Sequence, residues 1–143
     1  MDTLSYIKVK KVNCINVDAL IYDKLSSIFE PNEGNKFIIK EFGNFEVIFT
    51  FLPTYKITKL VLFLSKIGIL IEHIDITSDA LMSSMRNKRK HYEFVKTFED
   101  ESAKKELNEF LENNLSIDNI LDKIIIKGVD SLTDIDKKIL TKC

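Results

Sequence analysis

The sequence has few of the residues that interrupt or cross-link a fold: four glycines, two prolines and two cysteines in 143 residues. So few glycines and prolines argue against long flexible loops and disordered tails. The cysteines, Cys14 and Cys143, form no CxxC pair and have no histidine or cysteine nearby, which argues against a zinc site. Two free thiols are typical of a reducing compartment, so we expect a cytoplasmic protein.

Long hydrophobic runs and a strong net charge are also missing. The most apolar stretch, residues 57–71, contains Lys59 and Lys66 and is shorter than the ~20 residues that a membrane-spanning helix needs. Residues 1–11 contain no apolar signal segment. With 21 basic and 22 acidic groups the formal charge is −1, whereas a protein that coats nucleic acid carries a clear basic excess. We therefore expect a soluble protein without a membrane anchor, and nucleic acid is not its expected partner.

Residues for catalysis or for holding a cofactor are scarce. The only histidines are His73 and His91, and the four isolated glycines form no phosphate-binding loop. Strand alternation over residues 69–77 predicts that His73 and Asp75 share the sheet face away from the helices, where such residues usually form a surface pair. Neither an HExxH motif nor an EF-hand loop is present. The sequence thus predicts no enzyme, no cofactor and no metal site.

The chain has the length of one domain, and its hydrophobic periodicity predicts an α+β fold. The elements follow the order β-α-β-β-α-β, with strands at 6–12, 36–42, 45–51 and 69–77 and helices at 16–29 and 53–67. Gly43 and Asn44 favour a hairpin between the second and third strands, and Gly68 favours the end of the second helix. This order is that of the ferredoxin-like fold, a four-stranded antiparallel sheet with both helices on one face.

The alternation along residues 45–51 also predicts which face of the sheet the helices cover. The face expected to be buried against the second helix consists of Phe45, Val47 and Phe49, with Leu60, Val61 and Leu64 from that helix. The opposite face is expected to carry Lys8, Lys10, Glu46 and Thr50. Single-strand RNA binders of this topology stack bases on exposed aromatic side chains of the central strands. This orientation, with an acid on the open face, argues against RNA binding.

Residues 79–143 are expected to add three or four helices. We expect residues 1–78 to form the ferredoxin-like unit and residues 79–143 a helical extension packed on it, within a single domain. Ser116 predicts the start of a helix that ends at Gly128, with an inward face made of Ile117, Ile120, Leu121 and Ile124.

A short final helix is predicted from Thr133 and Asp136, which have the spacing of a capping box. Two helices joined at a glycine also invite comparison with a DNA-reading helix-turn-helix. The second helix of such a motif wants basic and amide side chains at its start, whereas this one starts with Asp134 and Asp136. The sequence therefore argues against DNA reading by this segment.

The stretch "NILDKIIIKGVDSLTDIDKKIL", residues 119–140, resembles a short helical hairpin found in the tails of rhomboid-like and other Bacteroidetes proteins. The shared pattern is "LDKI…G…SLT…(D/E)KK.L". The resemblance covers about 22 of the 143 residues and implies a lineage, without an activity.

One local charge cluster stands out in this balanced chain. Residues 79–98 carry a net charge of +3 and residues 99–143 a net charge of −4, while residues 1–78 are neutral overall. Five residues make the basic cluster: Arg86, Lys88, Arg89, Lys90 and His91. They interrupt a helical apolar pattern, which predicts an exposed turn or loop. Three interpretations remain open: a solvated segment, a patch satisfied by the acidic segment 99–112, or a partner-binding patch.

The sequence favours a non-enzymatic protein-binding module, most concretely a bacterial immunity or inhibitor protein that masks a toxin or effector. The reasons are a compact chain, no catalytic constellation, and mixed charge patches suited to specific docking. The basic cluster would contribute to docking an acidic partner surface. One alternative is a nucleic-acid-associated or regulatory protein that uses residues 86–91. A second is a small-ligand sensor. The oligomeric state stays open.

Overall fold

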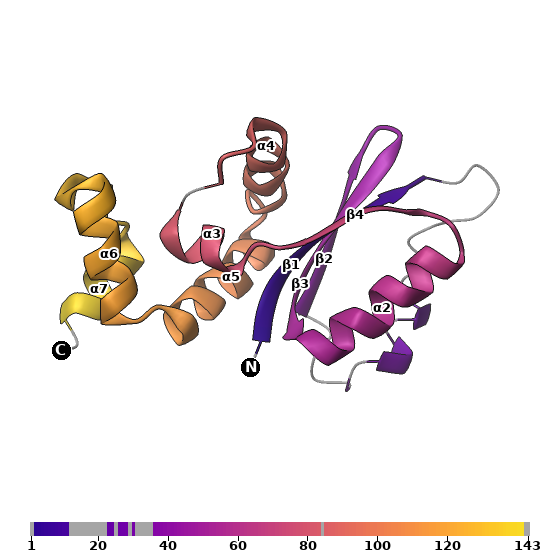
Figure 1. Cartoon of the computed structure of the whole chain (residues 1–143), viewed down its shortest axis with the longest axis horizontal. Coiled ribbons are helices and arrows are strands. Elements are labelled where there is room, and N and C mark those ends of the chain that lie inside the picture. Colours follow the sequence, from indigo (N-terminus) through magenta and orange to yellow (C-terminus); the bar gives the residue numbers. More distant parts are fainter. Residues whose placement is uncertain are drawn as a thin grey trace. The chain divides into compact units, whose positions relative to one another are not determined.

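The computed structural model describes residues 2–11, 23–24, 26–28, 30, 36–83 and 85–141. The chain forms two compact units, a sheet unit, Met1–Thr77, and a helical unit, Ser78–Cys143. Figure 1 shows the strands in the first unit and the run of helices in the second. The expectation of a single domain stays a prediction.

The sheet unit is built on four antiparallel strands, β1 (Asp2–Lys10), β2 (Phe37–Phe42), β3 (Phe45–Pro53) and β4 (Leu70–Asp75). Their order across the sheet is β2-β3-β1-β4, and every neighbouring pair is antiparallel. Gly43, with φ 69°, allows the tight β2–β3 hairpin that the sequence predicts. An α+β fold with a four-stranded antiparallel sheet is therefore confirmed.

Helix α2 (Thr54–Lys66) joins β3 to β4, close to its predicted bounds. Gly68, with φ 78°, follows its last turn as predicted, because a left-handed residue at this point is cheap only for glycine. Of the other helix predicted in this unit, residues 23–24 and 26–28 are helical. The rest of the 16–29 segment lies mostly outside the described residues, as does Cys14.

One face of the sheet packs against α2, as Figure 1 shows. This core contains eight buried residues: Ile7, Val9, Ile48, Leu52, Ile57, Leu60, Leu64 and Ile69. The residues that β3 contributes are Ile48 and Leu52, so alternation turns Phe45, Val47 and Phe49 to the other face. The prediction that Phe45, Val47 and Phe49 lie on the α2 side of the sheet is therefore wrong.

The reason is that β3 is apolar on both faces. Every side chain from Glu46 to Leu52 is buried, including Glu46 and Thr50, which were expected to be open to solvent. A period-two pattern identifies a face only when the other face is polar. On the face opposite α2, the rings of Tyr6 and Phe49 meet edge to face at 5.7 Å, and both are buried. Base stacking by these two rings would require them to be uncovered first.

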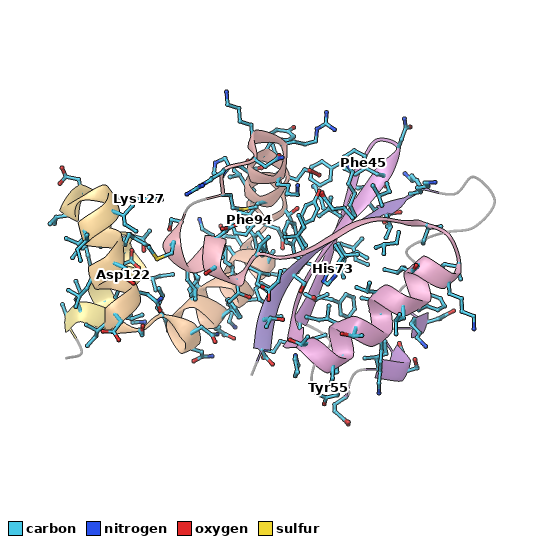
Figure 2. All side chains as sticks on the ribbon, viewed as in Figure 1. Phe45, Tyr55, His73, Phe94, Asp122 and Lys127 are labelled. Carbon is cyan, nitrogen blue, oxygen red and sulfur yellow. The ribbon has the colours of Figure 1, made fainter. Side chains whose placement is uncertain are left out.

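The helical unit contains α3 (Thr77–Met82), α4 (Lys88–Thr97), α5 (Glu101–Asn114), α6 (Ile117–Lys127), the 3-10 turn η2 (Val129–Ser131) and α7 (Asp134–Thr141). These are more helices than the three or four expected, because the predicted 79–98 segment is divided into α3 and α4. Buried side chains on their inner faces include Ala80, Phe98, Ala103, Leu107, Phe110 and Ile120. At the end of α4 the ring centroids of Phe94, labelled in Figure 2, and Phe98 lie 4.7 Å apart with the ring planes tilted by 48°.

The predicted caps of the last two helices are confirmed. The hydroxyl of Ser116 accepts a hydrogen bond from the Asn119 backbone amide, and the Ser116 backbone amide donates one to the side-chain oxygen of Asn119. Gly128 ends α6 with φ 86°. The carboxylate of Asp136 accepts from the Thr133 amide at 2.9 Å, and the Thr133 hydroxyl accepts from the Asp136 amide at 3.2 Å. Residues 119–140 lie in α6, η2 and α7, and their resemblance to the helical hairpin of other proteins stays a prediction.

Candidate protein-binding surfaces

The predicted basic cluster lies at the start of α4. Arg86 precedes the helix, and Lys88, Arg89, Lys90 and His91 form its first turn. Asn87 caps this turn, because its side-chain oxygen accepts hydrogen bonds from the Arg89 and Lys90 amides at 3.0 and 3.1 Å. The polar residues that interrupt the apolar pattern therefore mark a helix start. This fits the predicted exposed turn.

The charges of the cluster point to solvent. Arg86, Lys88, Arg89 and His91 are exposed, and Lys90 is half-buried. Within the described part of the chain, Arg86, Lys88 and Arg89 form no ion pair.

Two of the acids in the 99–112 segment pair with other cations. Lys96 lies 3.6 Å from Glu99, and Lys138 lies 2.7 Å from Glu112. These pairs leave three exposed cations of the basic cluster, Arg86, Lys88 and Arg89, without an acid that neutralises them among the described residues.

The basic cluster continues into an exposed apolar strip on the same side of α4. Tyr92 and Val95, one and two turns further along, are 56% and 44% exposed. Lys88, Tyr92 and Val95 are spaced by four and then three residues, so they line one side of the helix. We call this side, made of Arg86, Lys88, Arg89, Tyr92 and Val95, the basic face of α4.

A second exposed surface lies on α6 and η2, and sequence reasoning missed it. Ile120 is buried and Ile124 half-buried as predicted, but Ile117 and Leu121, which were also expected inside, are exposed. We call the exposed apolar side chains here the apolar row: Ile117, Leu121, Ile125, Ile126 and Val129, the last three 80%, 70% and 64% exposed. The run Ile124–Ile126 could have predicted an exposed apolar surface, because three successive residues of a helix cannot all face one core.

Acidic side chains border the apolar row. Asp118 and Asp122 follow Ile117 and Leu121 by one residue, and Asp130 follows Val129. All three are exposed, and Asp122 is labelled on α6 in Figure 2. The helical unit therefore carries two partly apolar surfaces, one bordered by cations and the other by carboxylates.

A buried polar cluster joins three helices of the same unit. The ammonium of Lys123 lies 2.7 Å from a carboxylate oxygen of Asp136, and both side chains are at most 1% exposed. Lys123 also donates to the Ser83 hydroxyl at 3.3 Å, and Lys127 donates to the Met82 and Ser83 carbonyls. A cavity of about 320 Å³ lies beside this cluster, lined by Ser83, Lys104, Asn108, Lys123 and Thr133 among others.

The contact between Ser83 and Lys123 invites comparison with a serine–lysine catalytic dyad. In such a dyad the lysine must be neutral to accept the serine proton. Burial raises the pKa of Asp136, but hydrogen bonds from Lys123 and Thr133 and the charge of Lys123 outweigh it, so this pKa lies below its ordinary value. Asp136 is thus an anion at neutral pH and accepts a hydrogen bond from Lys123 at 2.7 Å, so Lys123 is engaged with an acid as well as with Ser83. These contacts join the end of α3 to α6 and α7.

His73 of β4 lies on a different sheet face from the one predicted. It lies opposite Ile7 in the β1–β4 register, which places it on the α2 side of the sheet, so the predicted facing away from the helices is wrong. Burial lowers the pKa of His73, and the charge of Asp75 opposes this shift only in part. The Asp75 carboxylate accepts hydrogen bonds from the amide and hydroxyl of Thr77 at 2.9 and 2.6 Å. Asp75 is therefore engaged in a local turn.

The described ranges contain neither a metal-binding cluster nor a membrane-spanning helix. No group of three or more His, Cys, Asp or Glu side chains there could hold a metal ion. No helix in those ranges is long and apolar enough to cross a membrane. No protein-family model, curated protein or solved structure matches this chain.

Proposed function

We propose that this protein is a non-enzymatic protein-binding module that docks an acidic surface of another protein on the basic face of α4. Its most concrete form is a bacterial immunity or inhibitor protein that masks a toxin or effector in the cytoplasm. The observation that supports this proposal is a set of three exposed cations that have no acidic partner among the described residues and lie beside the exposed side chains of Tyr92 and Val95.

The position of these cations is unfavourable for folding. A helix N-terminus carries partial positive charge, and cations in the first turn oppose it by about 0.3–1 kcal/mol each at low salt. Lys88 and Arg89 occupy this turn, and α4 has no acid there. A docked carboxylate-rich surface would relieve both the repulsion among the cations and the conflict with the helix dipole. Electrostatic strain that a partner relieves is typical of a binding site.

A nucleic-acid-binding protein is the second candidate, supported by the same cations and by Tyr92. Proteins that bind single strands combine a basic groove with aromatic rings for base stacking. Here one exposed ring lies beside the cluster, and an apolar Val95 takes the next place along the face. This pairing of tyrosine with an aliphatic side chain fits a protein surface better, because interface cores combine aromatic and aliphatic side chains.

We infer that the sheet unit has the ferredoxin-like arrangement. The strand order β2-β3-β1-β4 supports this, because β3 lies between β1 and β2 and β1 lies between β3 and β4. Each β-α-β half is then split by one strand of the other half. Helix α2 on one face is consistent with it. The segment between β1 and β2 lies mostly outside the described residues.

The test compares partner capture by two variants of equal charge change. One replaces Arg86, Lys88 and Arg89 with serine, and its control replaces Lys40, Lys105 and Lys137, which are exposed at other places. Immobilised wild type, variant and control are incubated with a lysate of the source organism, and bound proteins are quantified by mass spectrometry. We expect at least one protein with an acidic surface to bind wild type and control and to be lost from the cluster variant at an unchanged melting temperature.

Two results would reject the proposal. One is that no bound protein distinguishes the cluster variant from the control. The other is micromolar binding of single- or double-stranded oligonucleotides at physiological salt that disappears in the cluster variant. Such binding would weaken with salt at a logarithmic slope of about −0.9 for each duplex phosphate neutralised, and it would favour the nucleic-acid candidate.

A further inference from the structure

We propose that the apolar row of α6 and η2 is an interface, and that its occupant is the basic face of α4 of a second copy of this chain. The inference rests on the proposed function because it uses the same basic face. It adds the identity of one partner and a second surface.

The apolar row has the layout of an interface core with a charged rim. Ile117, Leu121 and Ile125 follow one another at four-residue spacing and therefore form one stripe along α6. Val129 lies just beyond the helix end, in η2. Asp118, Asp122 and Asp130 are exposed, and each directly follows a residue of the apolar row in the sequence. Contiguous exposed apolar side chains with a polar border are typical of protein interaction sites.

The basic face of α4 is the matching surface on the same chain. It also has an apolar centre, Tyr92 and Val95, but its border consists of Arg86, Lys88 and Arg89. Surfaces of this kind fit when apolar centres meet and opposite charges align at the borders. The charges of the two surfaces are opposite, and within the described residues none of these three cations has an ion pair.

Pairing of like surfaces is disfavoured by the same charges. Two apolar rows placed against each other would bring Asp122 toward the acids of the other copy, and two basic faces would bring cations together. Figure 1 shows α4 and α6 well apart within the helical unit, and both surfaces are exposed, so one copy does not cover its own row. The contact is therefore head to tail between copies, and it repeats until a ring closes or a chain grows.

The area available predicts weak association. Five apolar side chains on one side and two on the other make an interface at the small end of the known range, where contacts are transient. We expect micromolar to millimolar dissociation constants, so the average mass should rise with protein concentration over this range. The mass should fall again at high salt, because exposed charges are screened.

Two charge-reversal variants test the pairing. The first carries Asp122→Lys and Asp130→Lys, which leaves Asp118 in the first turn of α6, where an acid stabilises the helix. The second carries Lys88→Glu and Arg89→Glu. Each variant alone presents two surfaces of like charge and should stay monomeric in analytical ultracentrifugation. An equimolar mixture has opposite charges at both kinds of contact, so mixing should restore association.

Controls separate the contact from misfolding and from general charge effects. Lys105→Glu with Lys137→Glu changes exposed lysines elsewhere and should associate like wild type. Ile125→Ser removes the most exposed apolar side chain of the row without disturbing a core, and should weaken association at least tenfold. Circular dichroism melts verify that every variant is folded.

Three results would overturn the inference: wild type that is monomeric at every concentration, a variant mixture that stays monomeric while wild type associates, or association that survives Lys88→Glu with Arg89→Glu. The last would indicate that apolar rows pair with each other.

The variant with Asp122 and Asp130 reversed keeps an intact basic face, so it should still capture a foreign acidic partner. Loss of self-association with capture retained would leave the proposed function standing, whereas loss of capture alone would reject only that function.

Discussion

The buried ion pair between Lys123 and Asp136 allows the sharpest stability prediction. Removing one partner of such a pair costs about 3–5 kcal/mol, because the other charge is left buried and uncompensated. Here both side chains are at most 1% exposed and their charged atoms are 2.7 Å apart. Lys123→Met and Asp136→Asn should therefore each lower the free energy of unfolding by about 3–5 kcal/mol. Because asparagine at position 136 can still accept the hydrogen bond from the Thr133 amide, the stability lost in Asp136→Asn reports on the missing charge.

The double variant should lose much less than the sum of the two single losses, since it leaves no unpaired charge. We expect a coupling free energy of about 1–3 kcal/mol from the double-mutant cycle. The measurement is urea unfolding followed by circular dichroism near neutral pH. Single losses below about 1 kcal/mol, or additive losses, would mean that the pair is solvated in solution and would refute the reasoning.

The same pair predicts a pH dependence. The pKa of Asp136 is lowered in the folded protein, so between the folded and unfolded values the unfolded chain binds more protons. The stabilisation is complete above the unfolded pKa of about 4 and disappears as the pH falls through the folded value. In Lys123→Met the carboxyl loses its cation while it stays buried, so this acid-induced loss of stability should vanish or reverse. If the variant lost stability at low pH as the wild type does, the loss could not be assigned to Asp136.

Three further changes are predicted. Arg89→Glu should raise the free energy of unfolding by about 0.5–1 kcal/mol in low salt because it places an acid at the positive end of α4; a fall would show that Arg89 has a stabilising partner. Phe49→Ala should cost about 3–5 kcal/mol, as expected for a fully buried ring in contact with Tyr6, and a cost below 1 kcal/mol in urea melts would show that this ring is open to solvent. Gly128→Ala should cost about 1–3 kcal/mol through backbone strain alone, since φ is 86° and an added Cβ meets no atom within 4 Å; a neutral thermal melt would contradict this conformation.

Local signals in the sequence were sufficient to predict where most of the helices and the hairpin begin or end. Gly43, Gly68 and Gly128 were each predicted at a turn or helix end, and all three have positive φ. The Ser116 and Thr133 caps follow the same logic, because the atoms that they join are three residues apart. Such interactions depend on a few neighbouring residues and are readable without the rest of the fold.

Where a segment is apolar on more than one side, the sequence did not predict which side packs against a neighbouring element. In β3 both alternating sets are buried, so only contact with α2 distinguishes Ile48 and Leu52 from Phe49. In α6 the apolar residues cover more than half of the helix, and the row that stays exposed is the part that no neighbouring helix covers. Periodicity measures how apolar residues are distributed around an element and does not identify the element that packs against them.

By itself, the sequence determined the four strands and α2 in their order, the caps of α6 and α7 and the position of the basic cluster, because each depends on residues within about one turn of one another. Tertiary structure alone decided which face of β3 meets α2, which side of α6 stays open, and that Lys123 meets Asp136 and Ser83. These two contacts of Lys123 join residues 13 positions apart in the case of Asp136 and 40 positions apart in the case of Ser83. No local pattern specifies a buried ion pair of this kind, since its partners are brought together only when α3, α6 and α7 pack and exclude water from the charges.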